Sequence, residues 1–344
     1  MTDTLIRQEG RTGHITLTRP QALNALTQGM VRAIDAALVA WADDPGVTLV
    51  VIDAVGDRAF CSGGDITDLY RAGRAGDYGF GQRFWREEYR MNARIAGYAK
   101  PVVTLMQGFC MGGGVGLGCH AGHRIVGESA RIALPECGIG LVPDVGGSRL
   151  LARAPGRLGA YLGVTGARLG PGDAIHAGFA DRFVPEADWP ALTAALVAAG
   201  DATPLPDHPV PAAPLAGLRD EIDTLFAADD LARIADRLAA SPSGFAAEAR
   251  AALARVSPLA AATLLEMLRR LGPSPSMAEA LSMEYRFTFR AQEHADFLEG
   301  IRAAVIDKDR TPRWLHAGAA VPVADVARML APLGADELEL EGEA

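Results

Sequence analysis

The sequence predicts an α/β protein in which strands alternate with helices, followed by a helical C-terminal region. Two apolar runs of strand length, 47–52 and 101–107, each lead into a glycine-bearing turn. The first run is continuously apolar, which is typical of a strand buried on both faces. Beyond a proline-rich stretch at 201–214, alanine, leucine and charged residues recur at helical spacing. Periodicity alone does not distinguish one α/β fold from another.

Length and composition limit the kind of protein. The 344 residues are 49% hydrophobic, enough for a substantial core and about two domains' worth of structure. The net charge of −9 argues against a nucleic acid or an anionic membrane as the main partner. The N-terminus has no apolar signal region, and no long uncharged apolar span follows, so we expect a soluble cytoplasmic protein.

The cysteines and histidines form no recognisable metal or disulfide pattern. The four cysteines include no C-x-x-C pair and lie in apolar or glycine-rich surroundings, so we expect them to be reduced core residues. The seven histidines show no metal-ligand spacing, and no metal is expected.

The first elements follow the strand, helix, strand order. Two short strands, 5–9 and 14–18, flank the turn Gly-Arg-Thr-Gly and predict a hairpin. Thr27 is expected to cap a helix that ends at Trp41, with apolar residues at helical spacing. The buried strand at 47–52 comes next.

The region between the two glycine turns is predicted to be partly mobile. Residues 70–81 are rich in glycine and charge, and we expect this segment to be mobile. A helix is predicted over 84–98. It carries the pair Glu87 and Glu88, and such a pair on a helix most often faces solvent.

A change in composition divides the chain. The proline-rich stretch at 201–214 is unlikely to be helical and predicts an extended connection. We therefore predict a core over 1–200, a connection over 201–217, a helical region over 218–335, and a disordered acidic tail over 336–344. Helices are expected over 218–240, 242–256, 259–271, 276–290 and 294–307.

The second glycine turn and two later acids carry the chemistry. Glycines at 112–118 permit positive φ and close approach of a ligand, and peptide N–H groups at the start of a helix lack intrahelical partners. A run of small residues can also be an ordinary tight turn. Glu136 and Asp144, however, lie in apolar surroundings where an idle ionised group would be costly to bury. Two carboxylates beside a candidate oxyanion site indicate acyl chemistry.

At these residues the chain resembles the crotonase (enoyl-CoA hydratase/isomerase) superfamily. The resemblance rests on AFCSGGDI at 59–66, the glycine run, and the Pro-Glu and Pro-Asp-Val-Gly-Gly segments. It implies the crotonase spiral of strand-strand-helix turns. Residues 159–168, 173–178 and 182–184 resemble the end of the family's core, which implies a helix, a short capped helix and a return strand there. The chain is most similar to the 3-hydroxyisobutyryl-CoA hydrolase branch, because of the Arg-Glu-Glu-Tyr segment and two C-terminal stretches, 276–287 and 296–314.

The resemblance implies roles for particular residues. The N–H groups of Gly64 and Gly113 would form the oxyanion hole. Glu136 would attack the thioester or activate water, and Asp144 would engage the substrate's hydroxyl or the leaving group. Glu88 would face the substrate, contrary to the usual behaviour of such a pair. Residues bordering the coenzyme A site would be Ala22, Leu23, Ser62, Gly64 and Asp65, although Asp65 is expected to cap a helix; Arg19, Arg58 and Lys100 are candidates for its phosphates.

The predicted reaction is hydrolysis of a short branched 3-hydroxyacyl-CoA in valine breakdown. Hydratases of the superfamily carry a first glutamate just after the glycine run, where this chain has Gly116. Losing one of two acid/base groups typically costs about 10²- to 10⁴-fold in rate. No cofactor is expected, since coenzyme A is part of the substrate. Superfamily members commonly form trimers or dimers of trimers, so we expect a homo-oligomer.

Other functions remain open. A hydratase or isomerase is the nearest alternative, because an isomerase can work with one suitably placed acid. A noncatalytic acyl-CoA-binding protein would keep the glycine turns but have no need for Glu88, Glu136 and Asp144 together. A dinucleotide-binding oxidoreductase is rejected, because GGGVGLG does not match the required glycine spacing and context.

Overall fold

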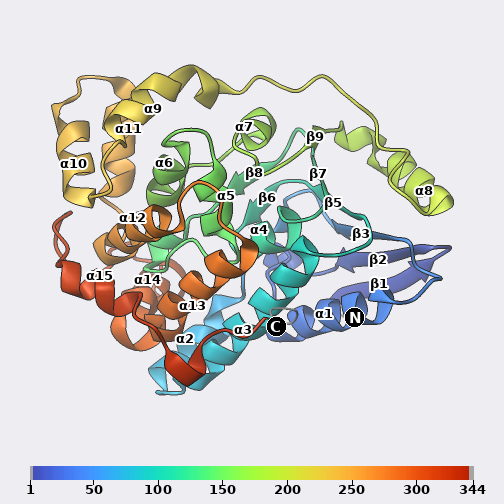
Figure 1. Cartoon of the computed structure of the whole chain (residues 1–344), viewed down its shortest axis with the longest axis horizontal. Helices are drawn as coiled ribbons and strands as arrows, with labels where there is room; N and C mark the ends of the chain where they lie inside the picture. The colour runs from blue at the N-terminus through green and yellow to red at the C-terminus, as the bar shows by residue number, and fades with distance from the viewer. Residues whose placement is uncertain (1–2, 341–344) are drawn as a thin grey trace. The chain divides into compact units, whose positions relative to one another are not determined.

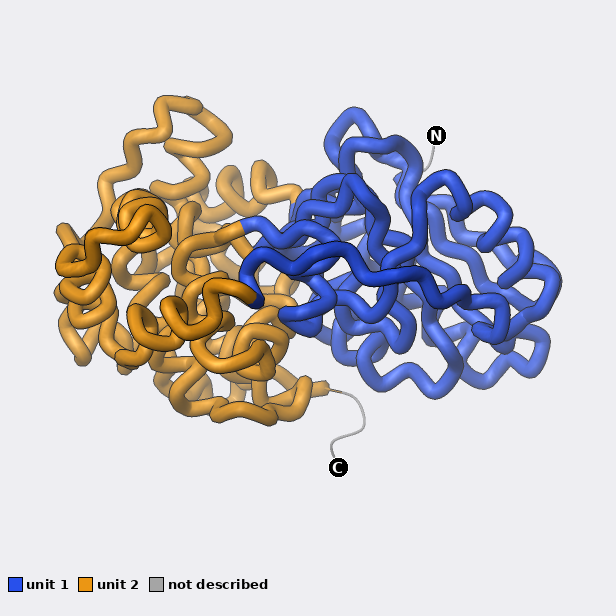
Figure 2. Tube along the Cα trace, turned by 90° about the horizontal axis from the view of Figure 1, so that it is seen from above, with its two compact units in different colours: residues 1–64, 87–133, 168–216 blue, residues 65–86, 134–167, 217–344 orange. Residues whose placement is uncertain are grey.

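The computed structural model describes residues 3–340, which form two compact units (Figure 2). Each unit gathers segments that are separated in the sequence. Unit 1, blue in Figure 2, comprises 3–64, 87–133 and 168–216; unit 2, orange, comprises 65–86, 134–167 and 217–340. This division differs from the predicted linear one, because 65–86 and 134–167 belong with the C-terminal helices. Helices bury their apolar faces against one another regardless of their order in the chain.

Unit 1 contains two sheets (Figure 1). In the six-stranded sheet the order is β1-β2-β3-β5-β7-β9; in the three-stranded sheet it is β4-β6-β8. Among the paired strands of the described residues, β1 and β2 run antiparallel and the other pairs run parallel. The strands are β1 (Thr4–Glu9), β2 (Thr12–Leu17), β3 (Leu49–Ala54), β4 (Ala59–Cys61), β5 (Val102–Met106), β6 (Phe109–Met111), β7 (His123–Val126), β8 (Arg131–Ala133) and β9 (Arg182–Phe183).

The helices of unit 1 cover the apolar residues of these strands. The predicted first helix is confirmed as α1 (Gln28–Ala42), and the Thr27 side chain accepts a hydrogen bond from the Met30 N–H as its cap. Leu192 and Leu196 of α8 pack on a buried cluster from β3, β5 and β7. The other helices are α4 (Gly113–Gly118), α7 (Pro171–His176), α8 (Trp189–Ala199) and the second half of α3 (Tyr78–Ala96).

Unit 2 is helical in its described residues. The predicted C-terminal helices are present, but 218–240 is divided into two helices, because Asp230 caps a new start by accepting from the Arg233 N–H. The helices are α2 (Ile66–Arg74), α5 (Gly147–Arg153), α6 (Leu158–Thr165), α9 (Arg219–Leu225), α10 (Leu231–Ala240), α11 (Gly244–Leu253), α12 (Pro258–Leu271), α13 (Met277–His294), α14 (Phe297–Ile301) and α15 (Val323–Met329). The 201–214 connection is not helical before a 3₁₀ turn begins at Pro214, as expected.

The prediction of a mobile segment at 70–81 is wrong. Residues 70–74 belong to α2 and 78–81 to α3, with a short turn at 75–77 between them, and α3 begins at Tyr78 rather than at the predicted Phe84. A Cβ atom at Gly73 would lie 2.7 Å from Leu298 Cδ2, and one at Gly81 would lie 2.3 Å from Gln292 Oε1. The glycines therefore allow close packing against α13 and α14. Their effect depends on the neighbours, which the sequence pattern does not reveal.

The C-terminal residues are also more ordered than expected. Arg286 forms an ion pair with Glu337, 2.9 Å between Nη2 and Oε1, and Leu338 is buried. The prediction of a disordered tail is therefore wrong for these residues, whereas 341–344 lie outside the described residues. Over residues 3–340, no single helix is long and apolar enough to cross a membrane; α11 and α12 reach that length and composition only as a pair bent by 112°.

Candidate active site

The two predicted oxyanion-hole residues lie together in unit 1. Gly64 follows β4, and Gly113 begins α4 directly after β6, a neighbour of β4 in the three-stranded sheet. A Cβ atom added to Gly113 would lie 3.3 Å from the Gly64 nitrogen. The two glycines therefore lie close together, as two donors to one carbonyl oxygen must.

Glu88 lies at the same place. It is on α3, only 2% of the residue is exposed, and its Oε1 would be 2.6 Å from the Cβ of an alanine at position 113. The adjacent Glu87 faces elsewhere and binds Arg32, with Nη2 2.8 Å from Oε1. The usual solvated interpretation therefore fits Glu87, whereas Glu88 is buried beside Gly113.

The segment expected to border coenzyme A pairs with the first glycine turn. Leu23 accepts a hydrogen bond at its carbonyl from the Ser62 N–H, 3.0 Å, and the Leu26 N–H donates to the Gly63 carbonyl, 2.8 Å. Sequence reasoning missed the residue that holds this arrangement. The Asn24 side chain is fully buried and binds the Arg19 N–H and the carbonyls of Val55 and Ala59. Asn24 has a φ of +54°, in the left-handed region, which asparagine tolerates better than most residues.

Several candidate contacts to coenzyme A prove to have structural partners. Lys100 donates from Nζ to the carbonyls of Trp41 and Asp44, at the end of α1. Arg19 donates from Nη1 to the Ala25 carbonyl, 2.6 Å, whereas Arg58 is exposed. Asp65 is at the N-cap position of α2, but the predicted side-chain cap bond is absent. Ala22 closes the 3₁₀ turn before Leu23.

Unit 2 carries the other two predicted acids. Glu136 begins the 3₁₀ turn η2 (Glu136–Ile139), and Asp144 follows in an irregular segment before α5. Their exposed fractions are only 5% and 4%. Both therefore occupy the apolar surroundings that the sequence predicts, where a carboxylate needs specific partners.

The turn that carries Glu136 packs against α14 backbone to backbone. A Cβ at Gly300 would lie 2.2 Å from the Ile139 oxygen, and one at Gly140 would lie 2.4 Å from the carbonyl carbon of Asp296. Gly140 also has a φ of +77°. These contacts permit only glycine at the two positions.

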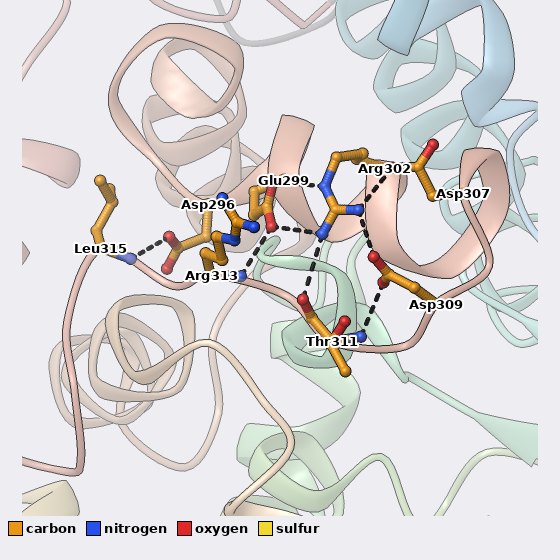
Figure 3. A network of polar contacts seen from close by, with 8 residues as sticks. All are labelled: Asp296, Glu299, Arg302, Asp307, Asp309, Thr311, Arg313 and Leu315. Carbon is orange, nitrogen blue, oxygen red and sulfur yellow. Dashed lines mark hydrogen bonds and ion pairs between the residues drawn. The ribbon is translucent and has the colours of Figure 1, made fainter.

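Asp296 connects the η2 turn to the C-terminal stretch 296–314, which resembles the hydrolase branch. One of its oxygens accepts from Ser257 Oγ, 2.6 Å, and the Ser257 N–H donates to the Cys137 carbonyl, next to Glu136. The other oxygen accepts from the Leu315 N–H, 2.7 Å (Figure 3). The C-terminal segment therefore supports the position of Glu136.

Arg302 organises the loop between α14 and Leu315 (Figure 3). Its guanidinium binds Glu299, Asp307 and Asp309 at 2.8, 2.6 and 2.7 Å, and it donates to the Thr311 carbonyl. The Glu299 carboxylate also accepts from the Arg313 N–H. One cation thus gathers the acids of the Ile-Asp-Lys-Asp sequence into a closed loop.

Another buried carboxyl group, that of Glu284, lies beside the Asp144 segment and was missed by sequence reasoning. It is on α13 and accepts hydrogen bonds from Gly146 and Ser148. Burial raises the pKa of Glu284 to about 8, and the charge of Asp144 contributes in the same direction against the hydrogen bonds. The predicted helix over 276–290 places Glu284 on a helix, but the pattern does not reveal its burial.

This shift predicts a pH-dependent stability. The folded-state pKa of Glu284 is above its ordinary value of 4.5, so the folded state binds the proton more tightly than the unfolded chain. The stabilisation of the folded state by the protonated Glu284 is fully present below about pH 4.5 and is lost as the pH rises toward 8. Each unit of pKa difference corresponds to about 1.4 kcal/mol. In urea unfolding, the free energy of unfolding should therefore change less between pH 5 and pH 8.5 for Glu284→Gln than for the wild type. Equal changes would contradict the raised pKa of Glu284, and the exposed change Glu293→Gln is the control.

The cysteines agree with the prediction of reduced core residues. Cys61, Cys110, Cys119 and Cys137 are all buried and free of disulfides. Burial raises the pKa of Cys61 to about 12, so this thiol stays protonated at neutral pH.

Comparison with known proteins identifies relatives over almost the whole chain. The sequence profile described as enoyl-CoA hydratase/isomerase matches residues 12–330. A mitochondrial 3-hydroxyisobutyryl-CoA hydrolase from Xenopus tropicalis is 41% identical over 326 residues, covering 90% of this chain and 83% of that protein. The human protein of the same name is 37% identical over 325 residues, with 91% and 84% covered.

Solved structures agree with the predicted fold. A crystal structure of an enoyl-CoA hydratase from Rhodobacter sphaeroides has 65% sequence identity and a TM-score of 0.97, covering 98% of this chain and 100% of that one. A carnitinyl-CoA dehydratase from Mycobacterium thermoresistibile has 41% identity and a TM-score of 0.94, with both chains fully covered. The prediction of a crotonase-type α/β fold is confirmed.

Proposed function

Because the chain belongs to the enoyl-CoA hydratase/isomerase family, we propose that it hydrolyses 3-hydroxyisobutyryl-CoA to 3-hydroxyisobutyrate and coenzyme A. The observation that carries this proposal is the residue after the glycine run. Where hydratases hold their first glutamate, this chain has Gly116, buried within α4. Glu136 and Asp144 are retained and buried. The names of the Xenopus and human relatives support the same reaction and its place in valine breakdown.

The chemistry requires a polarised thioester and a nucleophile. The N–H groups of Gly64 and Gly113 would hold the carbonyl oxygen as it becomes negative. The Glu136 carboxylate would attack the carbonyl carbon, so that the C–S bond breaks and coenzyme A leaves as the thiol after taking a proton. Water would then cleave the mixed anhydride and return the Glu136 carboxylate. In an equivalent route, Glu136 takes a proton from water, which attacks the thioester directly.

The remaining acids would recognise the substrate. Asp144 would bind the 3-hydroxyl group or protonate the leaving group, and Glu88, beside Gly113, would orient the acyl chain. These roles rest on the family resemblance. The reaction needs no further cofactor, since water and the thioester supply every atom of the products.

Hydration of an enoyl-CoA is the second candidate function. It is favoured by the names of the two proteins of solved structure, an enoyl-CoA hydratase and a carnitinyl-CoA dehydratase. Gly116 counts against it, because water addition across a double bond would lack one of its two acid/base groups.

Purified protein given (S)-3-hydroxyisobutyryl-CoA is expected to release free thiol, detected with a thiol reagent, without hydrating crotonyl-CoA. Isobutyryl-CoA should be cleaved about 10- to 100-fold more slowly in kcat/KM, because a buried group meant for the hydroxyl is left unpaired. Hydration of crotonyl-CoA without thiol release would instead establish the hydratase. Equal kcat/KM values for the two acyl groups would contradict the proposed recognition of the hydroxyl.

We propose a cytoplasmic location and a homo-oligomeric assembly, as the sequence predicts. The names of the Xenopus and human relatives include the word mitochondrial. The acyl-CoA substrate is the partner that family membership supports.

A further inference from the structure

The segment 144–148 in unit 2 has an unusual backbone. Val145 has a φ of +56° and Gly146 a φ of +78°, so two consecutive residues after Asp144 are in the left-handed region. For a β-branched residue such as Val145 this conformation is strained, typically by about 1 to 3 kcal/mol. Such a conformation persists only where surrounding contacts enforce it.

Glu284 supplies those contacts. Its Oε2 accepts from the Gly146 N–H, 2.8 Å, and its Oε1 accepts from both the N–H and the Oγ of Ser148, 2.9 and 2.5 Å. Glu284 is 0% exposed, so water does not compete for these bonds. One carboxylate thus grips the backbone on both sides of Gly147, immediately after the candidate catalytic Asp144.

The carboxyl group of Glu284 accepts from all three donors. Each of its oxygens has two acceptor positions, whereas the NH₂ group of a glutamine would face an N–H group at one end of the turn. The arrangement also has a cost, because a buried acid is placed where the charge of Asp144 opposes its own ionisation.

We propose that Glu284 is a positioning residue that acts through Asp144, by holding the 144–148 backbone so that the Asp144 carboxylate keeps one orientation toward the substrate. This inference rests on the proposed hydrolase function. Glu284 itself takes no part in bond making. Its loss would leave the Asp144 carboxylate free to adopt orientations that bind substrate but do not stabilise the transition state.

The test is a double-mutant cycle with thiol release from 3-hydroxyisobutyryl-CoA as the readout. Glu284→Gln is expected to lower kcat about 10- to 100-fold with KM changed less than about 3-fold. In the Asp144→Asn background the same change should cost less than about 3-fold, because the group through which it acts is already lost. Ser148→Ala removes one of the three donors and should lower kcat by a few fold. Glu293→Gln, an exposed change on the same helix, should behave as the wild type.

Each contrary outcome has its own meaning. An equal loss from Glu284→Gln in both backgrounds, or lower thermal stability with unchanged kcat, would reduce Glu284 to a structural residue. If Glu284→Gln does not fold, Ser148→Ala and its combination with Asp144→Asn complete the same cycle. Absence of thiol release from the wild type would overturn the proposed function, and with it the basis of this inference.

Discussion

Glu136→Gln is expected to lower thiol release from 3-hydroxyisobutyryl-CoA by at least about 10³-fold, with the protein still folded. Glutamine has nearly the same shape as glutamate, so the buried position after Pro135 remains filled. It carries no negative charge, however, and neither forms the mixed anhydride nor takes a proton from water. Initial rates under saturating substrate, with circular dichroism to verify folding, measure the effect.

The matched control for this change is Glu248→Gln on α11, which removes the same charge from an exposed position and should leave the rate unchanged. Undiminished turnover of Glu136→Gln would exclude both routes proposed for Glu136. The catalytic carboxylate would then have to be sought at Asp144 or Glu88.

Gly113→Ala is expected to lower kcat/KM for thiol release by about 10²- to 10³-fold or more. The new methyl group would lie 2.6 Å from Glu88 Oε1 and 3.3 Å from the Gly64 nitrogen, in the space between the two candidate oxyanion donors. Glu88 Oε1 and Leu26 Cδ1, also 3.3 Å away, belong to side chains that can shift, so the chain is expected to fold. The substrate carbonyl, however, would be displaced from the Gly113 N–H.

Gly170→Ala provides the comparison, because nothing lies within 4 Å of its added Cβ and its φ is negative at −75°. It should retain wild-type kinetics. Gly114→Ala would be uninformative, since its Cβ would lie 2.3 Å from the Cys61 carbonyl oxygen and would disturb the backbone itself. Wild-type kcat/KM for Gly113→Ala would remove Gly113 from the oxyanion hole.

Local sequence patterns predicted most elements, because those elements depend on local chemistry. Thr27 begins α1 since a threonine side chain caps a helix from within the same segment. The run at 101–107 forms β5, a strand buried throughout. By contrast, glycine and charge at 70–81 suggested mobility, and the segment proved helical because Gly73 and Gly81 meet side chains more than 200 positions away.

By itself the sequence determined the family, the two glycine turns, the acids Glu136 and Asp144, and the absence of an acid at position 116, since these are matters of residue identity and spacing. The resemblance also selected Glu88 of the two adjacent glutamates, and the structure buries it beside Gly113. Only the tertiary structure decided that Glu284 holds the turn after Asp144. It also decided that α14 supports the Glu136 turn. The physical reason is that burial and hydrogen bonding between distant segments are set by packing, which leaves no periodic trace in the chain.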